Sequence, residues 1–284
     1  MNSNHDITKY LSHAKINFGL QIINKRIDHY HNLKSYFIEI NLTDTLSFCP
    51  SLAFDLTVDG INVPTDESNL IYQAYNMIIK KNKSKKTAYT IHLNKKIPIG
   101  GGLGGGSSNA ATTIIALNQL WGLNLTKYEM EKLGASIGAD VPFFIRGGTQ
   151  FVEDIGTKLT PIKNNPLTKY YFVLIIPKIH ISTAWAYNKL NKSLQYINEE
   201  HKFPTLSEPM KWELFENDFE RVIHKTYPEI GTIKKILLQA GALYSSLSGS
   251  GSTVFGVFDN RQKAIDILNK LSQYQAYLTS PVIY

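Results

Sequence analysis

The chain has 284 residues, of which 43% are hydrophobic and 19% charged, a composition typical of a folded globular protein rather than a disordered one. Its formal net charge of +7 favours anionic partners such as nucleic acid, acidic membranes or phosphorylated small molecules. A single cysteine, Cys49, excludes an internal disulfide framework and is typical of a reducing compartment.

Neither the N-terminal sequence nor the longest apolar run suggests export or membrane insertion. The opening residues MNSNHDITKY lack the basic patch and apolar core of an export signal. The most apolar run, YYFVLIIP at 170–177, is too short to span a bilayer and is typical of a buried strand. We therefore expect a cytoplasmic protein.

The first half of the chain predicts strands followed by alternating helices and strands. Runs of β-branched and aromatic residues between turn residues predict strands at 12–23, 32–42, 45–60 and 87–93. Apolar residues at helical spacing predict a helix that starts at Leu70, with Ser68 or Asn69 as its N-cap, and another that Gly122 ends. Thr126 and Glu129 form a capping-box pair that starts a third helix, and VPFFI at 141–145 is expected to be a short buried strand.

The second half has the element order of a ferredoxin-like domain with extra helices. Strands are expected at 171–176, 242–248, 252–258 and 276–282. Helices are expected at 184–192, 212–225, 228–239 and 262–271. The turn residues at 164–166 are the best candidate for a junction, which predicts two domains, 1–165 and 166–284.

A glycine-rich stretch, KKIPIGGGLGGGSSNAATTII at 95–115, precedes the second helix. It lacks the lysine of a Walker A loop, and its G-x-G-x-x-G match at Gly100, Gly102 and Gly105 lacks the acidic residue that a dinucleotide fold would place further on. Bare amides at a helix start, together with the helix dipole, form a phosphate site, and Ser107 and Ser108 could cap the helix or bind phosphate oxygens. The alternative is a turn that only allows close helix packing.

The sequence of this loop resembles the P-x-x-x-G-L-G-S-S-A-A signature of the GHMP kinases. The doubled GLGGGSS form is similar to the branch that phosphorylates the 2-hydroxyl of 4-diphosphocytidyl-2-C-methyl-D-erythritol with ATP, in the non-mevalonate isoprenoid pathway. Five further segments, two before this loop and three after it, stand in the order expected of that branch: AKINFGLQIINKRIDHYHNL, SNLIYQA, GADVPFF, NDFE and SGSGSTVFG. The resemblance implies two α+β domains, the first similar to domain 2 of ribosomal protein S5 and the second ferredoxin-like, with the active cleft between them.

The resemblance also implies the catalytic residues. Asp140 matches the catalytic base, which takes the proton of the hydroxyl, and Lys15 matches the lysine that pairs with it. By alternation along a strand, Lys15 and Asn17 share one face, and Asn17 would then contact the substrate. Considered without the motifs, Asp140 would be a turn or cap residue and Lys15 a surface lysine on an edge strand.

The cytidine end of the substrate is implied to lie against two motifs. Tyr30 and His31 of RIDHYHNL match a pair that holds the cytosine, and Thr183 and Tyr187 of STAWAY match residues that stack on it. Periodicity alone would make Tyr187 a core aromatic. His29 replaces the usual glycine, so a positive φ there would strain the backbone. A metal site at Asp28, His29 and His31 is the alternative, but no further ligands stand at a familiar spacing.

The nucleotide is implied to contact the glycine loop and the residues near it. This set comprises Asn69, Leu70, Lys96, Pro98, Gly100, Gly101, Gly102, Leu103, Gly104, Gly105, Gly106, Ser107 and Ser108. The turn 247–251 matches the third family motif, whose backbone faces the reaction centre, although an ordinary hairpin turn would look the same. Mg²⁺ is expected to arrive with ATP, and no protein ligand for it is identified.

Two rival functions remain open at this point. The first is a GHMP kinase for another alcohol, such as mevalonate, homoserine or a sugar, which would not need residues that clamp a cytosine. The second is a basic RNA-binding module, for which no aromatic and Arg/Lys signature is visible. The expected partners are ATP and the cytidine diphosphate-linked substrate, without nucleic acid or membrane, in a monomer or weak homodimer.

Overall fold

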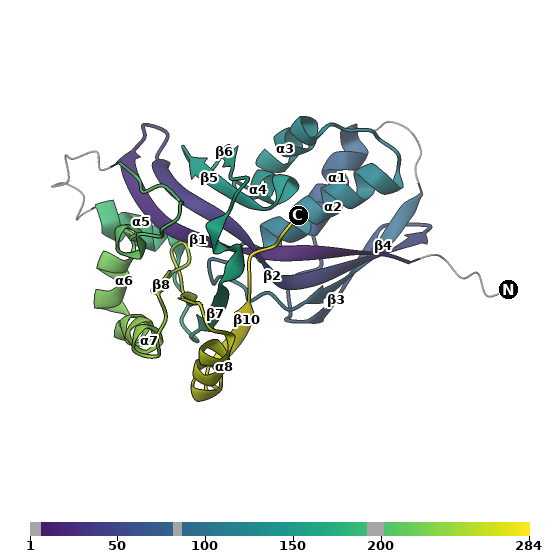
Figure 1. Ribbon diagram of the computed structural model, residues 1–284. Helices are drawn as coiled ribbons and strands as arrows, with labels where there is room; N and C mark the ends of the chain where they lie inside the picture. Colours follow the sequence, from purple (N-terminus) through teal and green to yellow (C-terminus); the bar gives the residue numbers. More distant parts are fainter. Residues whose placement is uncertain (1–6, 82–86, 192–201) are drawn as a thin grey trace. The chain divides into compact units, whose positions relative to one another are not determined.

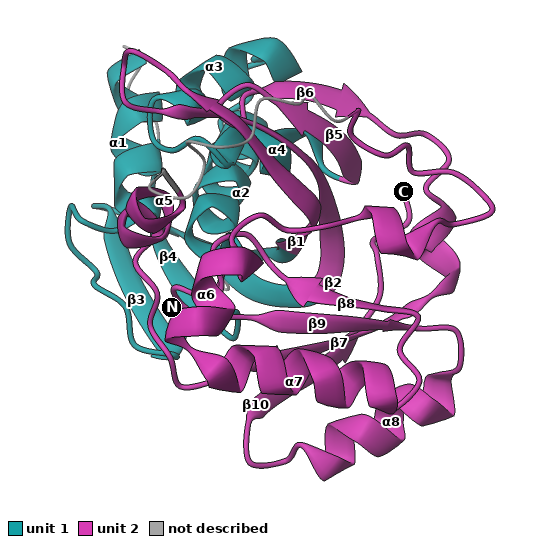
Figure 2. Ribbon diagram, turned by 90° about the vertical axis from the view of Figure 1, so that its left-hand side faces the viewer, with its two compact units in different colours: residues 1–14, 42–98, 104–147 teal, residues 15–41, 99–103, 148–284 magenta. Residues whose placement is uncertain are grey.

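The computed structural model describes residues 7–81, 87–191 and 202–284, and these form two compact units. Unit 1 contains residues 1–14, 42–98 and 104–147, and unit 2 contains residues 15–41, 99–103 and 148–284 (Figure 2). The chain therefore passes between the units several times, twice within the glycine-rich stretch 95–115. Residues 15–41 and 148–165 belong to unit 2, together with the C-terminal part of the chain. The boundary between the units is therefore not a single point in the sequence after residue 165. The domains 1–165 and 166–284 stay a prediction.

Among the described residues, unit 1 contains all or part of four β-strands. These are β1 (Thr8–Lys25) and β2 (His31–Ser51), each of which continues into or from unit 2, and β3 (Asp55–Gly60) and β4 (Ala88–Lys95). Residues 45–51 of β2 pair antiparallel with β4, and β3 pairs parallel with β4. One continuous strand, β2, thus covers a region for which the sequence predicted two.

The helices of unit 1 pack against one another. They are α1 (Leu70–Lys81), α2 (Gly105–Leu120), α3 (Lys127–Ala135) and α4 (Val141–Arg146). Contacts join α2 to each of the other three helices, and Trp121 at the end of α2 lies edge-on to Tyr75 of α1. Thr126 and Glu129 form the expected capping box at the start of α3.

The expected strand at 141–145 is wrong, because these residues form helix α4. Its residues from Val141 to Ile145 are all buried, and a short apolar run does not distinguish a buried strand from a buried helix. Pro142 stands in the first turn, where the missing amide hydrogen costs nothing and the fixed φ suits a helix.

Unit 2 contains the ferredoxin-like sheet that the sequence predicted. Its strands are β7 (Tyr171–Ile176), β8 (Tyr244–Leu247), β9 (Val254–Phe258) and β10 (Gln275–Thr279), in the antiparallel order β10-β7-β9-β8. Helices α7 (Pro228–Gln239) and α8 (Arg261–Lys270) cover one face of this sheet (Figure 1). A smaller set of strands in the same unit, β5 (Thr149–Glu153) and β6 (Lys158–Pro161), extends from residues 35–38 of β2.

The other helical segments among the described residues of unit 2 are short. They are the 3₁₀ turns η1 (Pro166–Lys169) and η3 (Trp212–Leu214), and the helices α5 (Thr183–Asn191) and α6 (Glu220–Thr226). The helix expected at 184–192 is α5, whose predicted last residue, Lys192, lies outside the described residues. The single helix expected at 212–225 is wrong. Asn217 accepts a hydrogen bond from the Phe219 amide and Asp218 one from the Ile22 amide, so these side chains favour a turn over a continuous helix.

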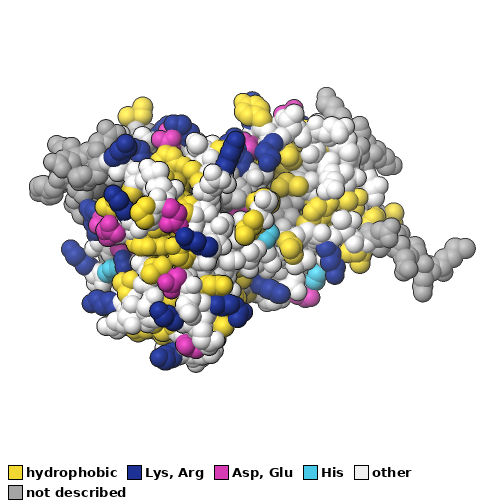
Figure 3. Space-filling model, in the orientation of Figure 1, with side chains coloured by type: hydrophobic (Ala, Val, Ile, Leu, Met, Phe, Trp, Pro, Cys, Tyr) yellow, Lys and Arg dark blue, Asp and Glu magenta, His cyan; other side chains and the backbone are white. Residues whose placement is uncertain are grey.

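The surface does not display one dense basic region on the face that Figure 3 shows. Lys and Arg side chains are spread among acidic and hydrophobic ones there (Figure 3). Among the described helices, none combines the length and the apolar character needed to cross a bilayer.

Candidate active site

The part of the glycine loop that lies in unit 2, residues 99–103, packs tightly on the turn that follows β8. Gly102 has φ +76°, and a Cβ built on it would lie 2.1 Å from the Ser248 carbonyl oxygen, so only glycine fits. The Ser248 hydroxyl donates to the Gly102 carbonyl at 2.9 Å, and the Thr253 amide donates to the Gly101 carbonyl at 3.3 Å. Close packing therefore accounts for the glycine at position 102.

The other end of the loop, in unit 1, forms the start of α2. Gly104 is the N-cap residue in a left-handed conformation, and no side chain within the described part of the chain caps this helix. Ser107 and Ser108 lie in the first helical turn instead, so the alternative that one of them caps α2 is wrong, and phosphate binding by these serines stays a prediction. The first-turn amides and the helix dipole together favour an anion at this position.

Beneath the first turn of α2 lies a buried polar network that the sequence analysis missed. Asp44 accepts hydrogen bonds from the amides of Lys96 and Ile97, from the Lys95 ammonium and from the Asn109 side-chain amide. Asn109 also donates to Ser12 at 2.9 Å, and the Ser12 and Ser108 hydroxyl oxygens are 2.7 Å apart. Burial lowers the pKa of Lys95, and the adjacent Asp44 carboxylate opposes that shift. The sequence offered one sign of this network, which is the charged residue Asp44 within a stretch otherwise typical of a strand.

Asp140 lies in unit 1 at the N-terminal end of α4, half-buried. Its side chain makes no capping hydrogen bond to that helix, so it does not act as an ordinary helix cap. A Cβ built on Gly138 would lie 3.8 Å from the Ser107 hydroxyl oxygen. The segment that carries Asp140 therefore runs beside the first turn of α2.

Of the residues predicted to contact the adenine, Leu70 lies beside the same helix start. A Cβ built on Gly106 would lie 3.6 Å from Leu70, so Leu70 lies beside the first turn of α2. The Asn69 side chain accepts from the Ile71 amide at 2.9 Å and donates to the Pro64 carbonyl at 2.6 Å, which confirms it as the N-cap of α1. Lys96 is exposed, whereas Pro98 is buried.

Lys15 and Asn17 lie next to each other on β1 in unit 2. The Lys15 ammonium donates to the Asn17 side-chain oxygen at 2.6 Å, which confirms that the two side chains share a face. Lys15 is only 4% exposed and its ammonium lies 4.6 Å from the centroid of the Phe37 ring, so the alternative of a surface lysine is wrong. The Lys15 amide donates to the Leu103 carbonyl at 2.9 Å, which joins this part of β1 to the glycine loop.

The two motifs predicted to hold a cytosine meet within unit 2. The rings of His31 and Tyr187 are stacked, with centroids 4.5 Å apart and an interplanar angle of 20°. Thr183 lies at the start of α5, and its hydroxyl oxygen is 3.0 Å from that of Ser250 in the turn 247–251. Tyr30 is 60% exposed and does not belong to this stack.

The loop before His31 has the strained backbone that its sequence suggested. His29 has φ +68°, a region that histidine enters more readily than most residues other than glycine. Asp28 accepts hydrogen bonds from the Arg26 guanidinium, which lowers the pKa of this carboxyl group. Within the described residues, no three or more His, Cys, Asp or Glu side chains form a group that could hold a metal ion.

Each unit thus gathers part of the predicted site. Unit 1 brings Leu70, Ser107 and the segment of Asp140 around the start of α2. Unit 2 joins Lys15 and Asn17 to the loop residues 101–103 and to the turn 247–251. It also pairs His31 with Tyr187.

Comparison with known families identifies the class to which this arrangement belongs. The model for the GHMP kinase N-terminal domain matches residues 69–148, and the model for the GHMP kinase C-terminal domain matches residues 194–276. The first match contains the glycine loop and Asp140, and the second contains the turn 247–251. The class that these matches define is that of ATP-dependent small-molecule kinases.

The most similar relatives narrow the class further. A 4-diphosphocytidyl-2-C-methyl-D-erythritol kinase from Chlorobium phaeovibrioides is 37% identical over 276 residues, covering 94% of each chain. The enzyme of the same name from Syntrophus aciditrophicus is 41% identical over 259 residues, covering 90% of this chain and 91% of the relative. The chain belongs to the family of 4-diphosphocytidyl-2-C-methyl-D-erythritol kinases within the GHMP kinases.

Solved structures agree with this assignment. A crystal structure of 4-(cytidine 5'-diphospho)-2C-methyl-D-erythritol kinase matches with a TM-score of 0.80 and 27% identity, over 97% of this chain and all of the other. The mevalonate kinase of Methanococcus jannaschii matches with a TM-score of 0.68 and 17% identity, which shows the shared fold alone. The relatives therefore favour the cytidylated substrate over the mevalonate-type and homoserine-type alternatives.

Proposed function

We propose that this chain transfers the γ-phosphoryl group of ATP to the 2-hydroxyl of 4-diphosphocytidyl-2-C-methyl-D-erythritol, giving the 2-phosphate and ADP in the non-mevalonate isoprenoid pathway. The observation that carries the choice of substrate is the stack of His31 on Tyr187. Two segments far apart in the sequence meet there, and both resemble the motifs that hold a cytosine. A kinase for mevalonate or homoserine would have no use for such a pair.

The start of α2 is proposed to hold the phosphates of ATP. Phosphoryl transfer requires mainly positioning and neutralisation of charge, and unpaired amides on a helix dipole provide both. Ser107 is half-buried, whereas Ser108 is 1% exposed and bonded to Ser12, so we assign phosphate contact to Ser107 rather than Ser108. Leu70 and Pro98 would contact the adenine from the same unit.

Asp140 is proposed as the general base and Lys15 as the cation that holds this base ionised. As the bond between the 2-hydroxyl oxygen and the γ-phosphorus forms, the hydroxyl proton passes to the Asp140 carboxylate, and the bond to the β-phosphate oxygen breaks. The contact of the neighbouring Gly138 with Ser107, in the first turn of α2, supports this role. The burial of Lys15 and its hydrogen bond to Asn17 support a fixed ammonium, and Asn17 would then contact the substrate.

Tyr187 is proposed to stack on the cytosine, and His31 to hydrogen-bond to its polar edge. A base on an aromatic face contributes about 1–3 kcal/mol to binding. Thr183 would contact the same ring from the start of α5, and the exposed Tyr30 would close over the base from its loop.

Magnesium is proposed to enter with ATP, where it would neutralise charge on the phosphates, and no protein ligand for it is assigned. We further propose that the protein acts in the cytoplasm, as a monomer or weak homodimer.

A coupled assay of ADP release tests this function. The full chain is supplied with ATP, Mg²⁺ and either the cytidylated erythritol substrate or mevalonate. We expect turnover of the cytidylated substrate alone, with ADP release reduced about 10³-fold or more in the Asp140→Asn variant. Turnover of mevalonate alone would reject the proposal.

A further inference from the structure

The segment Asn217–Glu220, with the sequence NDFE, resembles a family motif but has no role in the function proposed above. It lies in unit 2 after η3 and ends at the first residue of α6, Glu220. Asn217 and Asp218 are 3% and 7% exposed, and Phe219 is 1% exposed. Buried polar side chains of this kind must be hydrogen-bonded, so their partners indicate what the segment holds.

Asn217 binds the turn 247–251 at two carbonyl groups. Its side-chain amide donates to the Leu247 carbonyl at 2.8 Å and to the Gly249 carbonyl at 2.9 Å, and its oxygen accepts from the Phe219 amide. A Cβ built on Gly249 would lie 3.1 Å from the Asn17 side-chain oxygen. The carbonyls that Asn217 binds therefore belong to a turn that touches a proposed substrate-contacting residue.

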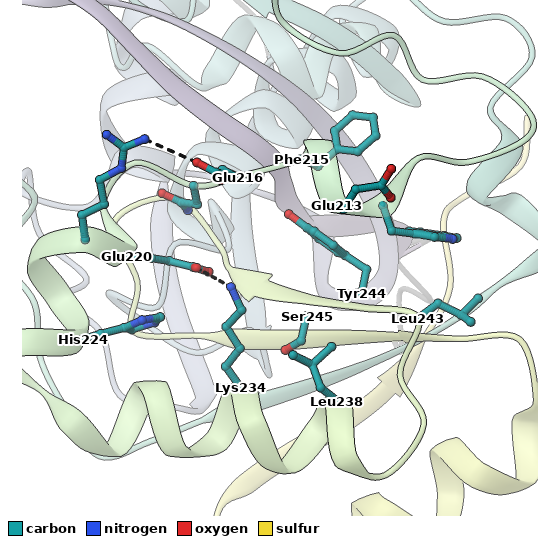
Figure 4. A pocket seen from close by; sticks show the side chains of 13 residues that line it. Glu213, Phe215, Glu216, Glu220, His224, Lys234, Leu238, Leu243, Tyr244 and Ser245 are labelled. Atoms are coloured by element: carbon teal, nitrogen blue, oxygen red, sulfur yellow. Dashed lines mark hydrogen bonds and ion pairs between the residues drawn. The ribbon is translucent and has the colours of Figure 1, made fainter. Parts of the chain in front are cut away.

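Glu220 holds the strand that leads into the same turn. One carboxylate oxygen accepts from the Ser246 hydroxyl and from the Leu247 amide, both at 2.9 Å, and the other accepts from the Lys234 ammonium at 2.5 Å. This ion pair lies in a cavity of about 720 Å³, where Lys234 reaches up from α7 to Glu220 (Figure 4). Glu220 thus fixes the start of the turn, and Lys234 fixes Glu220.

The two middle residues connect the segment to the cytosine-binding pair and to β1. The Phe219 ring lies edge-on to Tyr187, with centroids 4.9 Å apart, and Tyr187 in turn stacks on His31. Asp218 accepts from the Ile22 amide at 2.7 Å, and its own amide donates to the Leu20 carbonyl at 2.9 Å. These bonds fasten the segment to the strand that carries Lys15 and Asn17.

We propose that Asn217–Glu220 is a positioning segment, which holds the turn 247–251 and the Tyr187 ring in fixed places relative to β1. Asn217 and Glu220 position the turn, and Phe219 positions Tyr187. None of them touches the reacting atoms. The inference rests on the proposed function, because it assigns a purpose to the parts that the segment connects.

A role limited to fold stability makes a different prediction from a positioning role. Loss of stability alone lowers the melting temperature but leaves the kcat and KM of the folded enzyme unchanged. Misplacement of the turn lowers kcat, and misplacement of Tyr187 raises KM for the cytidylated substrate without changing KM for ATP. The two halves of the segment therefore have separate kinetic signatures.

The test for the turn compares Glu220→Ala with Glu220→Gln. Glutamine keeps an oxygen that accepts from Ser246 and Leu247, so we expect Glu220→Gln to retain most of its activity, whereas Glu220→Ala loses about tenfold or more in kcat. Asn217→Asp places a carboxylate against two carbonyl oxygens and should lose kcat at least as severely. Glu216→Gln is the matched control, because this neighbouring side chain is 72% exposed and pairs only with Arg221 among the described residues.

The test for the ring is Phe219→Leu, which keeps an apolar side chain but removes the edge-on contact. We expect KM for the cytidylated substrate to rise about threefold to tenfold, with KM for ATP unchanged. Thermal unfolding of every variant accompanies the kinetics. Normal kcat in Glu220→Ala and normal KM in Phe219→Leu, at a lowered melting temperature, would overturn the inference. Wild-type protein that fails to turn over the cytidylated substrate would instead overturn the proposed function.

Discussion

The Lys95 ammonium and the Asp44 carboxylate form an ion pair with Nζ and Oδ2 2.5 Å apart, and the two side chains are 4% and 0% exposed. The pair supports the part of the molecule proposed to bind phosphate. A Cβ built on Gly105 would lie 2.8 Å from the Lys95 nitrogen, so the ammonium lies against the first residue of α2. The other oxygen of Asp44 binds the amides of Lys96 and Ile97, which begin the glycine-rich stretch.

Breaking this pair from one side should destabilise the protein strongly. We expect Lys95→Met or Asp44→Asn each to lower the free energy of unfolding by about 3–5 kcal/mol, because a buried charge loses its partner. The double variant should lose less than the sum of the two single losses. Urea unfolding of all four proteins measures this coupling. Strictly additive losses would mean that the two side chains do not interact.

Gly104→Ala should weaken ATP binding, and Gly122→Ala is the control that separates this effect from a general loss of stability. Gly104 and Gly122 both have left-handed φ values, 69° and 59°, so alanine at either position should cost about 1 kcal/mol of stability. Only Gly104 is the N-cap of α2. We therefore expect ATP affinity to fall in Gly104→Ala and to stay normal in Gly122→Ala, as measured by calorimetric titration with ATP and Mg²⁺. Equal affinities would remove the start of α2 from the phosphate site.

Asp140→Asn should abolish turnover while it preserves the fold. The amide is nearly the same size as the carboxylate but cannot accept the hydroxyl proton, so we expect kcat to fall about 10³-fold or more with ATP affinity retained. Asp55→Asn, at an exposed position on β3, is the control and should be fully active. A value of kcat within about tenfold of wild type would exclude Asp140 as the general base.

The features that the sequence predicted are those set by local patterns. The alternation around Lys15 placed it correctly beside Asn17, and Thr126 with Glu129 placed the start of α3. The order of elements after residue 170 was enough to predict the ferredoxin-like sheet. Five short motifs in sequence order indicated the family that the comparisons then showed.

What the sequence could not predict depends on contacts between distant residues. Asp44 and Lys95 are far apart in the chain, and nothing in either local stretch indicates that they pair. The residues 141–145 read equally well as a strand or a buried helix, because only the packing around them decides. The capping role expected of Ser107 or Ser108 failed because the helix begins two to three residues earlier, at Gly105.

The unusual histidine at position 29 should be replaceable by glycine but not by valine. Glycine relieves the strain of φ +68° but makes the unfolded chain more flexible, so we expect His29→Gly to change stability by less than about 1 kcal/mol. Valine is branched at Cβ, and His29→Val should cost about 1–2 kcal/mol. Urea unfolding checks both values. A valine variant as stable as wild type would show that this loop readily takes another conformation.

His224 should make the free energy of unfolding decrease at acidic pH, because its surroundings lower its pKa. The side chain is half-buried against the Glu220–Lys234 pair, and its Nε2 has no hydrogen-bond partner among the described residues. Burial lowers its pKa below the ordinary value of 6.5, Lys234 and Lys235 lower it further, and Glu220 opposes them. The folded protein therefore takes up a proton at this position less readily than the unfolded chain does.

This sign predicts a loss of stability on acidification. As the pH falls through 6.5 toward the lower folded pKa, the unfolded chain binds a proton that the folded protein does not, so the free energy of unfolding decreases. His224→Gln cannot bind that proton, and its unfolding free energy should fall less between about pH 7.5 and pH 5.5 than that of wild type. Urea unfolding at the two pH values measures the difference. Parallel losses in both proteins would show that His224 titrates alike in the folded and unfolded states.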